Sequence, residues 1–214
     1  MPTFQTPEPI AVTVEVLSGE VTVAATDRTD TVVTVRPADE SRKGDLRAAE
    51  QTRVDFTAGT LSVITPRDWR TYTPFGGNPS IVVTIEVPTG SRLKGTAAVG
   101  RLVGTGELGR CDLEVAAGDI VVERPIDSVT AKTAKGDIRI GEVVRGEVRL
   151  ETSMGELEVG IGPGSAVRLE AGARHGTVQN RMAPVGPVEG HGDIVRVSAH
   201  NSYGDIIVRH ASVV

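Results

Sequence analysis

The stretch TAKGDIRIG at residues 133–141 is followed, nineteen residues later, by TSMGELEVG at residues 152–160. Both contain a glycine, an acidic residue directly after it, and branched aliphatic residues two and four positions beyond the glycine. Apolar and polar residues alternate around the glycine, which is typical of β-strands with one buried face. Each stretch therefore predicts a strand, a turn at the glycine and a second strand.

The same pattern recurs over most of the chain. Between Gly100 and Gly155 the turn glycines are 18, 18 and 19 residues apart, a regularity that is typical of repeat architectures. Eight copies, some of them lengthened or loose, centre on Gly19, Gly59, Gly100, Gly118, Gly136, Gly155, Gly176 and Gly204.

Glycine suits such a turn because it adopts a positive φ without steric cost. We assign a structural turn role to Gly19, Gly118, Gly136, Gly155 and Gly204. Acidic residues follow several of these glycines, and we expect each to accept hydrogen bonds from N–H groups of its own turn. Stacked ~4.8 Å apart they could instead collect Ca²⁺, but the chain lacks the glycine-rich nonapeptide of calcium-binding β-rolls. These acids are Asp119, Asp137, Glu156 and Asp205.

A two-stranded unit cannot bury its apolar face alone, so the repetition predicts that the units stack. We expect an all-β fold in which strand–glycine turn–strand units form a β-solenoid or β-roll-like stack, because the repeat length stays near 18 residues. An antiparallel β-sandwich or meander is the alternative, since a period of two places the same residues inside in both arrangements.

The length of 214 residues lies within the range of one all-β domain, so we expect a single domain over residues 1–214. Regular repeats are predicted in residues 91–214, and irregular strands with one short helix or loop in residues 1–90. The helix candidate is the polar stretch at residues 38–51, with Ser41 as its N-cap.

Composition and charge exclude several classes of partner. The net charge of −5, with both signs interspersed, provides no basic face for nucleic acid. No stretch approaches the ~20 apolar residues that span a bilayer, and the N-terminal stretch lacks the pattern of a secretory signal. Cys111 is the single cysteine, so no intramolecular disulfide is predicted. We expect a cytoplasmic protein without a cofactor.

The repeated strand, glycine–acid turn and strand resembles the bacterial putative-adhesin family of β-strand-repeat domains of unknown function. The likeness covers most of the chain and is clearest from SIVVTIEVPTGSRL (residues 80–93) through GDIVV, KGDIRI and MGELEV to YGDIIV. In that family the turn commonly reads Ser-Gly-Asp, and the nearest copy here is Ser18, Gly19 and Glu20. The resemblance implies a non-enzymatic module and carries over no catalytic residue.

Residues with catalytic or metal-binding chemistry show no functional spacing. There is no G-x-S-x-G motif, and Cys111 occupies an apolar position of the repeat, which is typical of a core residue. The histidines all lie in the last 40 residues, but no HxxxH or His–Cys spacing supports zinc. They are His175, His191, His200 and His210. We therefore expect neither a metal site nor an enzyme.

The loop RDWRTYTPFGGNP (residues 67–79) holds three of the six aromatic residues of the chain. Such a mixture of aromatic residues and arginine is enriched in interface hot spots, and the alternative is that the loop covers an open end of the stack. The candidate interaction residues are Trp69, Tyr72, Phe75, Arg67 and Arg70. The next choice is the edge formed by the turns, with Lys135, Met154, His175 and Tyr203.

The sequence thus predicts a non-enzymatic structural or protein-interaction module that works in the cytoplasm on an unidentified protein partner, and self-association is compatible with this interpretation. The alternatives are an envelope-associated binder of a ligand or glycan, and a carbohydrate-active β-helix enzyme. The scarcity of aromatic residues along the repeats, 3% of the chain, argues against the enzyme because sugar rings stack on aromatic side chains.

Overall fold

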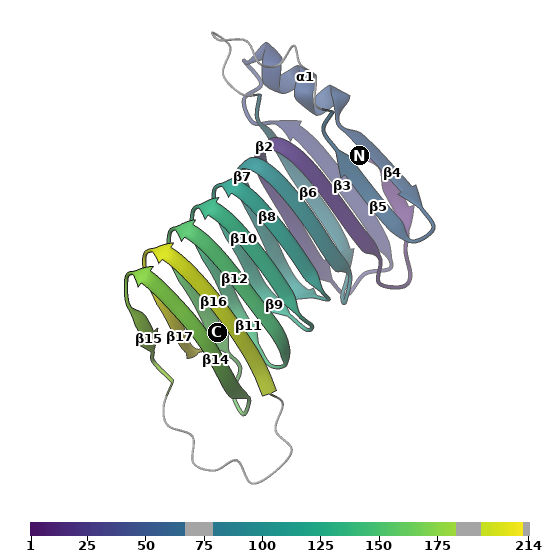
Figure 1. Cartoon of the computed structure of the whole chain (residues 1–214). Coiled ribbons are helices and arrows are strands. Elements are labelled where there is room, and N and C mark those ends of the chain that lie inside the picture. The colour runs from purple at the N-terminus through teal and green to yellow at the C-terminus, as the bar shows by residue number, and fades with distance from the viewer. Residues whose placement is uncertain (67–78, 183–193, 212–214) are drawn as a thin grey trace.

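The structure is a computed structural model that describes residues 1–66, 79–182 and 194–211. Within them the chain forms one sheet system of 17 strands and a single helix, α1. The strands coil into a stack of parallel rungs (Figure 1), so the predicted all-β solenoid is confirmed and the antiparallel sandwich is not formed. Helix α1 is too short and polar to span a membrane, and no other helix occurs in the residues described.

Each regular rung consists of a strand, a glycine turn and a second strand that returns on the opposite side of the core. The first strands form a front layer and the second strands a back layer, and each layer continues by parallel pairing from rung to rung. β2 and β7 are long strands that bend at the glycine and contribute to both layers. The rungs are β2 (Ala11–Thr26), β7 (Arg92–Leu108), β8 (Cys111–Ala117) with β9 (Ile120–Pro125), β10 (Val129–Lys135) with β11 (Ile138–Val143), β12 (Gly146–Met154) with β13 (Leu157–Ile161), β14 (Ala166–His175) with β15 (Val178–Asn180), and β16 (Ile194–Tyr203) with β17 (Ile206–His210).

The core lies between the two layers and consists of aliphatic side chains at alternate strand positions. In one rung Val148 and Leu150 of β12 and Leu157 and Val159 of β13 are at most 2% exposed. Corresponding positions are occupied by valine, isoleucine, leucine or alanine in neighbouring rungs, as the parallel register requires. The low aromatic content follows from this narrow core, because each rung leaves room for small and medium aliphatic residues.

The spatial order of the rungs departs from the order of the chain at both ends. Strands β16 and β17 lie between β12/β13 and β14/β15, so the last rung of the sequence is inside the stack (Figure 1). At the other end β2 pairs with β7 on one side and with β5 (Thr60–Ile64) and β6 (Ile81–Pro88) on the other. The regular stack therefore extends into the first 90 residues, beyond the predicted boundary at residue 91.

Antiparallel strands close the stack beyond β5 and β6. β4 (Arg53–Thr57) pairs with β5, β3 (Asp30–Pro37) pairs with β6, and β1 (Thr3–Gln5) pairs with β3. The predicted repeat copy at Gly59 is therefore wrong: Gly59 and Ala58, whose φ is 49°, form the hairpin turn between β4 and β5. The alternation there resembled a rung because one face of a hairpin is also buried.

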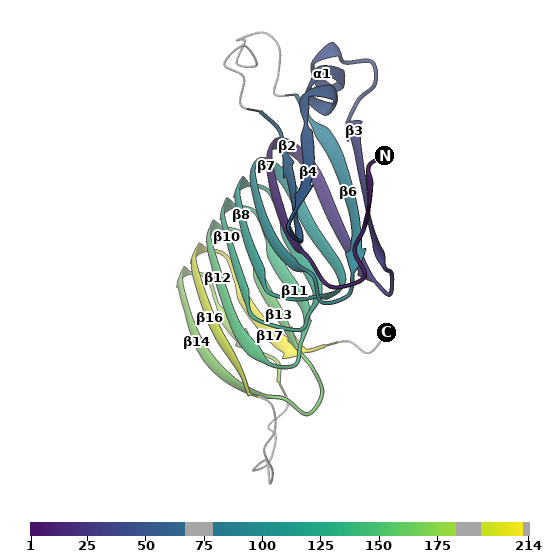
Figure 2. The same cartoon turned by 90° about the vertical axis from the view of Figure 1, so that its right-hand side faces the viewer.

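Helix α1 (Lys43–Gln51) lies within the predicted stretch and sits at this closed end of the stack (Figure 2). Ser41 is not its N-cap: the cap residue is Arg42, and no side chain caps the helix. The hydroxyl and the backbone N–H of Ser41 instead donate to Asp39 Oδ1, at 2.6 and 2.8 Å. The local Asp–Ser turn thus competes with capping for the same side chain.

The turn glycines lie above one another in a glycine ladder, which contains all five glycines to which we assigned a turn role. Those five have φ between 127° and 149°. The backbones of successive rungs approach so closely that a Cβ at Gly136 would lie 2.0 Å from the carbonyl oxygen of Gly118. Glycine is thus required both by its φ and by the close approach of the neighbouring rung. In stack order the ladder is Gly19, Gly100, Gly118, Gly136, Gly155, Gly204 and Gly176.

The acidic residues after these glycines connect rungs. Asp119 Oδ1 accepts a hydrogen bond from the backbone N–H of Asp137, and Asp137 Oδ1 accepts one from that of Glu156, at 3.0 and 2.8 Å. Asp205 Oδ1 accepts the N–H of Thr177 at 2.8 Å. The expectation that each acid caps its own turn is wrong, because the next N–H along the stack is nearer than those of its own turn.

Candidate binding surface

The outer edge of the turns presents one side chain per rung, from the residue directly before each ladder glycine. Parallel pairing brings these residues into register with one another across the rungs. Neighbours in such a register lie ~4.8 Å apart along the stack. We call this set the turn-edge row; in stack order it consists of Ser18, Val99, Ala117, Lys135, Met154, Tyr203 and His175.

Large apolar side chains of the turn-edge row are exposed to solvent. Val99, Met154 and Tyr203 are 43%, 51% and 54% exposed. The ring of Tyr203 stacks on that of His175, with centroids 4.7 Å apart and an interplanar angle of 15°. Lys135 adds a cationic side chain to the row. These side chains contribute little to the core, and a contiguous exposed apolar strip is a feature of interaction sites.

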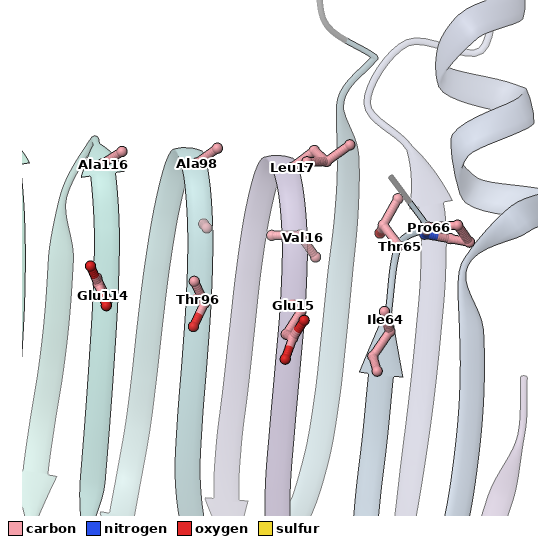
Figure 3. A pocket seen from close by; sticks show the side chains of 11 residues that line it. Glu15, Val16, Leu17, Ile64, Thr65, Pro66, Thr96, Ala98, Glu114 and Ala116 are labelled. Atoms are coloured by element: carbon pink, nitrogen blue, oxygen red, sulfur yellow. The ribbon is translucent and has the colours of Figure 1, made fainter. Parts of the chain in front are cut away.

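A shallow hollow of about 330 Å³ adjoins the row at the closed end of the stack (Figure 3). Leu17, Ala98 and Ala116 line it at the level of the turns, and Figure 3 shows Glu15 and Glu114 further down the same strands. The end of β5 and the residues after it form the opposite wall, namely Ile64, Thr65 and Pro66. The hollow thus combines an apolar rim with carboxylates below it.

Acidic residues flank the ladder on the back-layer side of the turns. Asp205 shows their state: the N–H and side chain of Thr177 donate hydrogen bonds to its carboxylate and lower its pKa. One oxygen of Asp119, Asp137 and Asp205 accepts a backbone N–H. The turn edge is therefore an apolar row with negative charge along one side. The acids of this flank are Glu20, Asp119, Asp137, Glu156 and Asp205.

The predicted interaction loop falls outside the residues that the structure describes. Trp69, Tyr72, Phe75, Arg67 and Arg70 all belong to the segment 67–78. The described chain reaches that segment at Pro66, which lines the hollow, and leaves it at Pro79, beside Gly44 of α1.

The second predicted surface is brought together by the fold, since Lys135, Met154, Tyr203 and His175 are consecutive members of the turn-edge row. The hollow was not predicted. Its signal in the sequence is an apolar residue two positions before the glycine, where the alternation points outward, as in Leu17, Ala98 and Ala116.

The histidines do not converge. His175 lies on the turn edge, His200 on the outer face of β16 and His210 at the end of β17, while His191 lies outside the residues described. In residues 1–66, 79–182 and 194–211, no three His, Cys, Asp or Glu side chains are grouped as metal ligands.

Cys111 is a core residue with no exposed surface. Burial raises the pKa of its thiol to about 12, and the nearby carboxylates of Asp112 and Asp127 act in the same direction. A thiolate is the reactive form of cysteine, so this thiol is inert near neutral pH.

No family model matches the chain, and no curated protein matches it. Its fold is similar to that of a putative cell adhesion protein from Clostridium sporogenes, with a TM-score of 0.57, 12% identity and 98% of each chain covered. A putative adhesin from Bacteroides fragilis matches with a TM-score of 0.45 and 11% identity over 97% of this chain and 95% of that one. A putative lipid binding protein from Parabacteroides distasonis matches with a TM-score of 0.35 and 13% identity over 98% of this chain and 93% of that one.

Of these likenesses, the first has a TM-score high enough to carry an argument, and at its level of identity the argument concerns the fold alone. It covers nearly the whole length of both chains. The chain therefore has the fold of the Clostridium sporogenes cell adhesion protein, in agreement with the resemblance of its glycine–acid repeat to the putative-adhesin family.

Proposed function

We propose that the chain is a non-enzymatic interaction module of the putative-adhesin type and that the turn-edge row binds a protein partner. The observation that carries the proposal is the line of exposed apolar side chains at Val99, Met154 and Tyr203. Folding does not require apolar residues at these positions, because they point away from the core. Methionine and tyrosine are also among the residues enriched in protein interfaces.

The backbone that carries this row is held in place by contacts between rungs. The Oγ1 atoms of Thr133 and Thr152 donate to the carbonyl oxygens of Gly118 and Gly136, at 3.1 and 3.2 Å. Asn201 Nδ2 donates to the carbonyl oxygen of Gly155 at 2.6 Å. A preorganised surface loses less conformational entropy when it binds, so an apolar row on a rigid edge suits recognition.

The charge beside the row indicates the chemistry of the partner. The acidic flank lies parallel to the row, with Asp119, Asp137 and Asp205 among its members. Complementary charge speeds association and excludes wrong partners. We infer that the partner presents an apolar strip bordered by lysine or arginine.

The carboxylates of the described chain support a structural role for these groups. Glu158 of β13 forms ion pairs with Arg139, at 2.6 Å, and with Arg209. Partial burial raises the pKa of Glu158, but the hydrogen bonds from the two guanidinium groups outweigh burial and leave it lowered. A general acid needs a raised pKa to be protonated near neutral pH, so Glu158 is suited to joining rungs.

We propose the cytoplasm as the working compartment. The support is the chemistry of Cys111, a buried thiol that needs no oxidising environment. Fractionation of native cells with an antibody against the chain tests this, and recovery in the envelope fraction would favour the alternative of an envelope-associated binder.

The binding proposal is tested with a double variant, Met154→Ser with Tyr203→Ser. A matched control is Leu46→Ser with Val144→Ser, which removes exposed apolar side chains of 38% and 36% exposure away from the turn edge. Partners captured from native lysate by immobilised wild type are identified, purified and titrated against each variant. Two interface anchors at ~1–2 kcal/mol each predict at least a tenfold weaker Kd for the turn-edge variant. Equal affinity for all three proteins contradicts the proposal.

A further inference from the structure

The two ends of the stack differ in how their outermost strands are treated. At one end antiparallel strands β1, β3 and β4 and helix α1 follow the last parallel rung. At the other end β14 pairs with β16 on its inner side, and no strand among residues 1–66, 79–182 and 194–211 pairs with its outer side (Figure 1). The outermost position belongs to β14 because β16 and β17 insert before it.

The outer edge of β14 is competent to pair. Its sequence, AVRLEAGARH, contains neither proline nor lysine, the residues that commonly protect edge strands. A strand of ten residues that pairs on one side leaves roughly half of its backbone N–H and C=O groups directed outward. Such an edge is a template for a further strand.

The core under β14 is also half covered. Val167, Leu169 and Ala171 of β14 are partly buried, whereas Val195, Val197 and Ala199 at the same register positions of β16 are at most 1% exposed. On the back layer Val178 is 43% exposed and its register partner Ile206 is fully buried. One more strand beyond β14 would bring its apolar residues to the burial of the rung behind them.

We propose that the missing strand is β14 of a second copy of this chain, paired antiparallel about a two-fold axis at Leu169. In this register Leu169 faces its own copy, and Val167 faces Ala171 of the partner subunit. The outward side chains are complementary, because Arg168 lies opposite Glu170 of the partner subunit and the same pair recurs on the other side of the axis. Opposite charges directly across an antiparallel pair are stabilising.

The pattern of β14 selects this register over its neighbour. A shift of one residue would turn the apolar face outward. A two-fold axis at Ala171 keeps the faces but places Arg168 opposite Arg174 of the partner subunit, and like charges across a pair repel. The opposite end of the stack is closed by antiparallel strands and offers no equivalent parallel rung. The assembly therefore stops at two subunits and does not grow into a filament.

The proposed dimer would carry two turn-edge rows. Antiparallel pairing reverses the strand direction, so the turn edges of the two subunits lie on opposite sides of the assembly. This inference is independent of the proposed function, since a dimer forms whether or not the row binds a partner.

The test measures mass in solution by light scattering after gel filtration and by sedimentation over a range of concentrations. Seven residues of β14, from 166 to 172, overlap with their copies, which makes a small interface. We expect a reversible dimer whose mass rises with concentration. A mass of one chain up to the solubility limit overturns the proposal.

Charge variants test the register. Glu170→Arg places arginine opposite Arg168 of the partner subunit and should abolish the dimer, whereas Arg168→Glu combined with Glu170→Arg should restore it. Glu147→Arg on β12, an interior strand, has the same charge change and should leave the mass of the wild type unchanged. If the double exchange stays monomeric while wild type is dimeric, pairing about Leu169 is wrong. If Glu147→Arg dissociates the dimer as fully as Glu170→Arg, the effect is one of net charge, and the proposal also fails.

Discussion

Replacing Gly136 by alanine adds one methyl group at the closest approach between two rungs. The new Cβ would lie 2.0 Å from the carbonyl oxygen of Gly118 and 2.5 Å from its carbonyl carbon. Both are backbone atoms, so no side-chain rotation can relieve the overlap. The rungs of Gly118 and Gly136 must separate locally, and alanine must in addition adopt a φ of 143°.

The cost has two parts. Holding a non-glycine residue at such a φ costs ~1–3 kcal/mol. Separating the rungs by about 1 Å breaks two hydrogen bonds between them: Gly118 N to Lys135 O at 2.7 Å and Asp137 N to Asp119 Oδ1 at 3.0 Å. At ~0.5–1.5 kcal/mol per bond the total reaches about 2–6 kcal/mol. That is a large share of a typical folding free energy of ~5–15 kcal/mol and lowers Tm by roughly 5–20 °C.

Thermal and urea unfolding of three variants separate these parts. Gly59→Ala has a positive φ of 74° but no heavy atom within 4 Å of the added Cβ, so it reports backbone strain alone. Gly172→Ala has neither a positive φ nor a contact closer than 3.8 Å and should match wild type or be slightly more stable. If Gly136→Ala destabilises no more than Gly59→Ala, the reasoning from close approach is refuted.

Three further predictions concern single groups. Thr152→Val removes the hydroxyl that donates to Gly136 O and should lower the free energy of unfolding by ~1 kcal/mol in urea titrations; no change would show that this bond adds nothing. The lowered pKa of Asp205 means that its contribution is present above the ordinary pKa of aspartate and lost as pH falls through the folded-state pKa, so the Tm of wild type should fall more between pH 7 and pH 3 than that of Asp205→Asn; parallel pH profiles would contradict this. With its pKa raised to about 12, the Cys111 thiol should resist a thiol reagent at pH 8 until the protein unfolds, and rapid labelling of native protein would disprove it.

The repeat unit could be predicted because its signal is local. The glycine, the acid after it and the alternation around both depend on one rung and its neighbour, and the spacing of 18 or 19 residues reports the length of a rung. The hairpin at Gly59 escaped prediction for the same reason, since a two-residue alternation is common to parallel rungs and antiparallel hairpins.

The order of the rungs could not be predicted, because it depends on which surfaces meet. The inward residues of β14 and β16 are of similar type, so either rung could pack on β12 as far as hydrophobic pattern is concerned. Polar positions distinguish them in the structure: Thr133, Thr152 and Asn201 share one buried register position, whereas β14 has Ala173 there. Asn201 donates to Gly155 O, and Ala173 has no side-chain donor for that carbonyl.

The candidate surface was predicted in part. Lys135, Met154, His175 and Tyr203 share one place in the repeat, so their alignment along the turn edge follows from the stack. The hollow beside them also requires β5, which reaches the turn edge through the antiparallel end of the fold. No repeat position encodes that wall, so Ile64 and Pro66 could be found only in the structure.

The exchanged order of the last two rungs has a consequence for synthesis on the ribosome. β14 and β15 emerge before β16 and β17, yet within the described residues they pair with no other rung. At ~5–20 residues per second, the roughly 50 residues from Ile161 to His210 take about 2–10 s to make. During that interval the nascent chain ends at β13, and residues 166–180 stay unpaired outside it. Completion then requires the youngest strands to intercalate between older ones, so the last 20 or so residues of the chain anchor two rungs, and a premature stop would release both.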